Sequence, residues 1–216
     1  MNVLILCDDL WHPGDVLKRG LKPLEADGFC LDFVPSPKDV LTNAFLRRYD
    51  VIVNGRGNSH SAANSSAPWF EPNVTAVMPG DFRRYVEEGH GFLALHAGNT
   101  SHRPHEMAEF IGNDFIKHPP QCGVKVTPVG THPILDGVEP FTVRDEHYMI
   151  DVFAPDAEVI LESTSDTEAG TQTAGYVRTM GKGRFCALTP GHNLAVYENE
   201  NYLKLLKQAI RWCAGE

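Results

Sequence analysis

Polar and ionisable side chains follow three short apolar runs in the first half of the chain. In open α/β sheets, ligands bind in the crevice at the carboxyl ends of the strands. One polar group after a strand could be no more than a solvated loop, but three in succession favour a site at one edge of a sheet. The three groups are Asp8, Asp9 and His12, then residues 54–60, then residues 96–102.

Residues 92–98, with the sequence Phe-Leu-Ala-Leu-His-Ala-Gly, predict a buried strand that ends in a sharp turn at His96. This strand and turn resemble a nucleophile elbow, and Gly98 has no side chain that would clash in the tight turn. Because the apex carries an imidazole and no Ser or Cys, acyl-enzyme chemistry is disfavoured, and acid/base work or metal ligation is favoured. The turn should expose the His96 side chain. A histidine that only bonds a backbone carbonyl is the alternative.

Two further segments carry candidate catalytic groups. Residues 144–148, Arg-Asp-Glu-His-Tyr, would place Glu146 and Tyr148 on one face of a strand, with an acidic solvated turn as the alternative. His192 follows the apolar run 184–188. We predict that His96, Glu146 and His192 converge on one pocket as catalytic residues. The same three side chains would suit a zinc or manganese ion, although no short-spaced ligand motif accompanies them.

The segments between these groups predict how they are positioned. Apolar runs at residues 3–7, 30–34, 51–53 and 92–95 alternate with helical segments. This alternation predicts an α/β fold with a flavodoxin-like, mainly parallel, doubly wound sheet and helices on both faces. One helix is expected to run from Pro37 to Leu46, and another, with an apolar stripe from Tyr202 to Cys213, to close the chain.

The second half of the chain has a different pattern. Its apolar segments are shorter and lie at residues 124–129, 141–143, 159–161, 175–178 and 184–188. We predict added short strands there, some antiparallel and at the sheet edge. The Gly-Lys-Gly-Arg segment at 181–184 favours a hairpin turn over a phosphate-binding loop. No stretch resembles a linker between two cores, which predicts a single domain over residues 1–216.

Composition excludes several classes of function. The chain has 28 Asp and Glu against 19 Lys and Arg, so its net charge is -9 and it lacks a clustered basic face for nucleic acid. The N-terminus has no basic segment and only a short apolar run, which predicts a cytoplasmic protein with no membrane partner. Five widely spaced cysteines argue against a disulfide framework. The sequence does not decide whether the chain forms a homo-oligomer.

The remaining polar groups near the predicted strand ends would surround a small-molecule substrate. Residues 55–69 form a long segment rich in Ser, Asn and Ala, and are predicted to act as a wall or lid over the pocket. The candidate substrate-binding residues are Asp9, His12, Arg56, Asn58, Asn99, His118 and Tyr148.

The order and spacing of these motifs, over almost the whole chain, resemble the ThuA-like (trehalose utilisation) family. The resemblance implies a fold similar to class I glutamine amidotransferases. His96 stands where those enzymes carry their nucleophilic cysteine, so amidotransferase activity is not expected. The family resemblance also implies a role in sugar metabolism, namely the handling of 3-keto-glycosides made by a partner dehydrogenase. The motifs are Gly91-Phe-Leu-Ala-Leu-His96-Ala-Gly98, His118-Pro119, His132-Pro133-Ile134, Gly137, Phe141, Asp145-Glu146-His147-Tyr148, Gly181-Lys-Gly-Arg184, Gly191-His192 and Ile210-Arg-Trp212-Cys-Ala-Gly215.

A 3-keto sugar has an acidic proton at C2, and its removal permits elimination of the C1 substituent, or isomerisation, through an enediolate. His96 or Glu146 would be the base, while His192, Arg56 or a divalent metal would stabilise the enediolate. Metal-assisted hydrolysis of the glycoside is a further route. Two other functions are left open: a non-catalytic sugar-binding or regulatory module, and a metal-dependent hydrolase of another small carbonyl compound.

Overall fold

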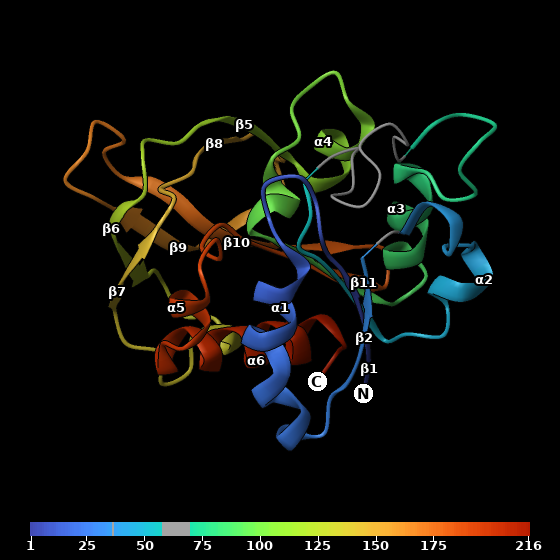
Figure 1. The fold of residues 1–216 in the computed structure, drawn as a ribbon, viewed down its shortest axis with the longest axis horizontal. Coiled ribbons are helices and arrows are strands. Elements are labelled where there is room, and N and C mark those ends of the chain that lie inside the picture. Colours follow the sequence, from blue (N-terminus) through green and yellow to red (C-terminus); the bar gives the residue numbers. More distant parts are fainter. Residues whose placement is uncertain (36, 58–69) are drawn as a thin grey trace.

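A nine-stranded sheet forms the centre of the computed structural model, which describes residues 1–35, 37–57 and 70–216 (Figure 1). The first five strands of the sheet order are parallel, and each later strand is antiparallel to its neighbour. In sheet order the strands are β2 (Cys30–Val34), β1 (Asn2–Leu6), β3 (Val51–Asn54), β4 (Gly91–Leu95), β11 (Gly183–Leu188), β10 (Gln172–Met180), β9 (Glu158–Thr164), β6 (Cys122–Pro128) and β7 (Phe141–Asp145).

Burial along the strands follows their place in the sheet. Every residue of β3 and β4 is buried, as expected for parallel strands that are covered on both faces and read as continuous apolar runs. In β7, at the edge, buried and exposed residues alternate, so only one of its faces is covered. A separate two-stranded ribbon pairs β5 (Asn113–Lys117) with β8 (Met149–Val152).

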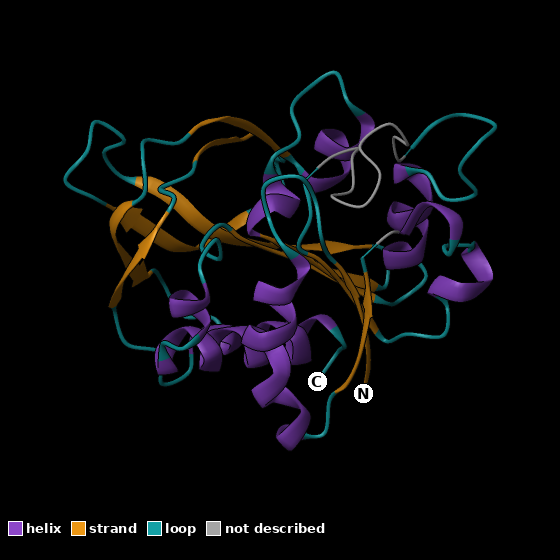
Figure 2. Ribbon diagram, viewed as in Figure 1, coloured by secondary structure: helices purple, strands orange, loops and turns teal. Residues whose placement is uncertain are grey.

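Helices cover both faces of the sheet (Figure 2). On one face lie α1 (Gly14–Leu21), α5 (Leu194–Tyr197) and α6 (Glu200–Cys213), which share an apolar core with the 3₁₀ turns η1 (Lys22–Asp27) and η4 (Pro133–Leu135). On the other face lie α2 (Asn43–Leu46), α3 (Pro79–Glu87) and α4 (Glu106–Ile111). The remaining 3₁₀ turns are η2 (Pro37–Asp39) and η3 (His96–Asn99). No helix in the described ranges is long and apolar enough to cross a membrane.

The α/β class, the parallel N-terminal strands and the helices on both faces are confirmed. The expectation of a mainly parallel sheet is wrong, because four of its eight pairings are antiparallel. A hairpin at residues 181–182 does join β10 to β11, as predicted. Among the added strands, β6 and β7 lie antiparallel at the sheet edge, as predicted for some of them, whereas β11 lies in the middle of the sheet beside β4, where its apolar run is buried on both faces.

One local expectation also differs from the structure, and another falls mostly on residues that the structure does not describe. The helix expected from Pro37 to Leu46 is instead the turn η2 followed by the short helix α2. Thr42 interrupts it with an extended backbone and caps α2 by accepting a hydrogen bond from the Phe45 N–H. The lid predicted over residues 55–69 lies mostly outside the described residues, since only Gly55, Arg56 and Gly57 of that segment are described.

Candidate functional site

His96 occupies a tight turn directly after β4. Its backbone has a positive φ of 45°, which is uncommon for a residue with a side chain. The turn depends on Gly98, because a Cβ atom there would overlap the backbone carbonyl oxygen of Asn54. The prediction that this turn exposes the His96 side chain is wrong: only 3% of it is exposed. The ring packs beneath Tyr148, with centroids 4.3 Å apart.

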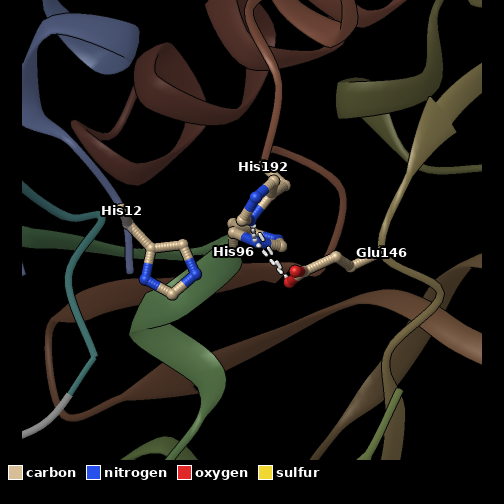
Figure 3. A group of neighbouring side chains, drawn as sticks. All are labelled: His12, His96, Glu146 and His192. Carbon is tan, nitrogen blue, oxygen red and sulfur yellow. Dashed lines mark hydrogen bonds and ion pairs between the residues drawn. The ribbon is translucent and has the colours of Figure 1, made fainter. Parts of the chain in front are cut away.

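Four side chains from distant parts of the sequence meet at this turn (Figure 3). His12 comes from the loop after β1, His96 from η3, Glu146 from the connection between β7 and β8, and His192 from the loop after β11. One nitrogen or carboxylate oxygen from each lies within 4.8 Å of the others. The structure thus brings together the three residues expected to converge, and adds His12 to them.

The spacing of three of these atoms matches the ligand shell of a single metal ion. The His96 Nε2 to His192 Nδ1 distance is 3.3 Å, and Glu146 Oε2 lies 3.5 Å from the former and 3.3 Å from the latter. Ligands about 2.0–2.1 Å from a tetrahedral zinc ion are separated by about 3.3–3.4 Å. The triangle therefore fits a tetrahedral ion with little rearrangement.

Hydrogen bonds on the far side of two rings determine which nitrogen faces the centre. His96 Nδ1 lies 2.7 Å from the carbonyl oxygen of Thr189, and His12 Nδ1 lies 2.7 Å from Asp9 Oδ1. Both partners accept here, so each Nδ1 carries a proton and each Nε2 faces the centre, where it can bind a cation or, when protonated, donate to a carboxylate. In the neutral rings the two Nε2 lone pairs lie near the Glu146 carboxylate, and these electron-rich atoms need a proton or a cation between them.

The electrostatics of the cluster agree with this arrangement. Burial alone would raise the pKa of Glu146, but hydrogen bonds to His192 and His96 outweigh it and hold the pKa well below its usual range. The same contact with Glu146 raises the pKa of His192. Burial lowers the pKa of His12, which favours its neutral form. At neutral pH the Glu146 carboxylate is therefore ionised, and the neutral His12 ring can act as a metal ligand.

Asp145 holds two of the contributing loops together, a role that the sequence did not suggest. This residue is fully buried, and its carboxylate accepts hydrogen bonds from the N–H groups of Gly191 at 2.7 Å and His192 at 3.0 Å. Gly191 allows a close approach, because a Cβ atom there would lie 2.9 Å from the Cβ of His96. The carboxylate next to Glu146 in the chain thus sets the position of His192.

A cavity of about 580 Å³ opens beside the cluster. Its lining includes four predicted substrate-binding residues, Asp9, His12, His118 and Tyr148. His118 is about one-third exposed, and its Nε2 lies 3.6 Å from Glu146 Oε2. The Tyr148 hydroxyl lies 3.1 Å from His96 Nε2, and burial raises the pKa of Tyr148. No motif in the sequence indicates the apolar part of the lining, which consists of Leu10, Trp11 and Phe115.

Two predicted substrate-binding residues, Asn99 and Arg56, lie outside the cavity lining. Asn99 is fully buried and is absent from the cavity lining; its amide donates to the carbonyl groups of Ala94 and Leu188, 3.0 Å away in each case, and so ties the ends of β4 and β11 together. A direct contact of Asn99 with substrate is therefore not supported. Arg56 is also buried and outside the lining. Asn58 lies outside the described residues.

Comparison with known proteins identifies the family. Residues 15–213 match the ThuA family, which is described as trehalose utilisation. The chain belongs to the ThuA family. Asp9 and His12 precede the matched region. A search of curated proteins finds no match.

Solved structures share the fold of this ThuA-family chain at low sequence identity. A ThuA-like protein of Bacteroides uniformis ATCC 8492 is 20% identical, with a TM-score of 0.75 over 99% of this chain and 91% of its own. A ThuA-like protein of Parabacteroides merdae ATCC 43184 is 19% identical, with a TM-score of 0.76 over 99% and 90%. A β-galactosidase of Rahnella sp. R3 matches 97% of this chain with 31% of its own, at 14% identity and a TM-score of 0.63.

Proposed function

We propose that this chain is a metal-dependent enzyme of sugar metabolism that acts on a 3-keto-glycoside by acid/base chemistry. The observation that carries the proposal is the convergence of His12, His96, Glu146 and His192 beside a cavity, with one nitrogen or carboxylate oxygen from each within 4.8 Å of the others. The description of the family as trehalose utilisation supports a sugar as the substrate.

The donor set suits zinc or manganese. Imidazole and carboxylate ligands bind both ions, and a site with three protein ligands keeps a position open for substrate or water. His96, His192 and Glu146 would hold the ion, and His12 would complete the shell or face the bound substrate. When bound, such an ion supplies positive charge that polarises a carbonyl oxygen and stabilises an enediolate.

Proton transfer in this proposal belongs to a residue that reaches the cavity. His96 is buried beneath Tyr148 and does not line the cavity, so we assign it to holding the ion and not to the role of base. His118 lines the cavity, and its Nδ1 lies 2.8 Å from the carbonyl oxygen of Pro119. That carbonyl keeps the proton on Nδ1, so Nε2 is available to accept the C2 proton of a 3-keto sugar.

Turnover of 3-ketotrehalose by protein loaded with zinc or manganese tests the proposal, with chelator-treated protein as the control. We expect release of glucose, or an isomerised sugar, from the loaded protein only. Binding of the sugar without product in either sample would support the sugar-binding module. Turnover of simple carbonyl compounds but not of the keto-glycoside would instead support the hydrolase.

A further inference from the structure

Two large apolar side chains stand exposed beside the metal cluster. Trp11 is 77% exposed and Leu10 is 50% exposed, and both residues line the cavity that His12, Glu146 and His192 also line. Tryptophan is highly buried on average in folded proteins, so such exposure beside polar ligands is informative. In Figure 1 the blue loop that carries both residues lies on the same side of the sheet as the β5–β8 ribbon, which contributes Phe115.

We propose that Trp11 is the platform on which the second sugar ring of the glycoside stacks, while the oxidised ring meets the metal cluster. Trp11 would then determine the preference for a two-ring glycoside over a single sugar. This inference rests on the proposed function, because it takes the cluster as the place where the reacting ring binds.

A pyranose ring suits this platform chemically. One face of a pyranose presents C–H groups, which pack on the electron-rich face of an indole, while its hydroxyl groups remain free for polar partners. A cavity of about 580 Å³ lies within the range of about 300–1,000 Å³ found for pockets that bind drug-sized ligands. It therefore has room for more than one sugar ring.

A single carboxylate links the platform to the cluster. Asp9 Oδ1 accepts hydrogen bonds from the N–H groups of Trp11 and His12, 2.9 Å away in each case, and also contacts the His12 ring. The second oxygen of Asp9 accepts from the N–H of Gly57. The position of Trp11 relative to the cluster is thus set by the residue that orients a metal ligand. A ligand with two rings could therefore contact Trp11 and the metal cluster at the same time.

The test is a comparison of trehalose and glucose binding by isothermal titration calorimetry. We expect the wild-type protein to bind trehalose about tenfold more tightly than glucose, and the Trp11→Ala variant to bind both equally. That loss corresponds to about 1.4 kcal/mol. The Trp11→Phe variant, which keeps an aromatic face, should retain most of the preference. Because the side chain is exposed, the melting temperature of each variant should stay unchanged.

Ile116→Ala is the matched control, since Ile116 is 57% exposed next to Phe115 but does not line the cavity. This variant should bind trehalose as the wild type does. The inference is overturned if the wild-type protein fails to prefer trehalose, if Trp11→Ala keeps the preference, or if a second copy of the chain covers Trp11 in solution. Because binding is measured without turnover, a Trp11-dependent preference in a protein that turns over no keto-glycoside would contradict the proposed function alone.

Discussion

Replacement of His96 by Ala separates the metal-binding role of this residue from its structural role. The substitution removes a ring that stacks on Tyr148 and a hydrogen bond to the carbonyl oxygen of Thr189. An unpaired buried acceptor costs about 1–3 kcal/mol, and a lost aromatic contact about 0.5–1.5 kcal/mol. The backbone strain at a φ of 45° is common to His and Ala and cancels.

The expected loss of unfolding free energy is therefore about 1.5–4.5 kcal/mol in metal-free protein. For a chain of this size, that lowers the melting temperature by about 3–18 °C, so the variant should still fold. Metal binding should fall much further, because the cluster loses one of its three closest ligands. Turnover should fall by a factor of at least about 10², a loss typical of removing one catalytic group.

His90→Ala is a matched control from the other end of β4. His90 also stacks on a tyrosine, Tyr85, at a centroid distance of 4.3 Å, and its Nδ1 lies 3.1 Å from the carbonyl oxygen of Tyr49. Calorimetry and elemental analysis should show a loss of stability in both variants, smaller for His90→Ala because the Tyr49 carbonyl oxygen still accepts from the Tyr85 hydroxyl, but loss of metal in His96→Ala only. The reasoning is refuted if His96→Ala binds metal and turns over substrate as the wild type does.

Three further substitutions extend this test. Asp9→Asn removes the charge that orients His12, so zinc affinity measured by competition with a chelator should fall about 10–100-fold while the fold persists; unchanged affinity would exclude His12 as a ligand. Gly98→Ala places a Cβ against the carbonyl oxygen of Asn54, and should lower both the melting temperature and the metal content; a native melting temperature would contradict this. In chelator-treated protein, contact with Glu146 raises the pKa of His192, so its contribution to stability is full below about pH 6.5 and is lost as pH rises through the raised pKa. Denaturation should therefore show a larger difference between wild type and Glu146→Gln at about pH 6 than at about pH 9, and an equal difference at both would show that the pair is not coupled.

The part of the site that could be predicted from sequence follows from local rules. A buried apolar run that ends in His96-Ala97-Gly98 indicates a strand and a turn by itself, and the carboxyl ends of parallel strands share one edge of the sheet. His96 and His192 are therefore expected at the same edge. The depth at which a side chain lies does not follow from these local rules, because the depth of His96 depends on Tyr148 and on a loop about ninety residues away.

Strand pairing in the second half of the chain was not predictable for a related reason. The apolar run of β11 is typical of a strand buried on both faces, but no feature of that run indicates that β4 is the neighbouring strand. The roles of His12 and Asn99 likewise depend on contacts that the sequence pattern alone does not identify. His12 joins the cluster because Asp9 turns its Nε2 towards Tyr148, and Asn99 is removed from the cavity because its amide bonds two strand ends.

Metal analysis of protein purified without chelator tests the central claim most directly. We predict about one equivalent of zinc or manganese per chain in the wild-type protein, and little or none in the Glu146→Ala and His192→Ala variants. A folded wild-type protein that contains no such metal, and takes up neither zinc nor manganese on dialysis against them, would contradict the account.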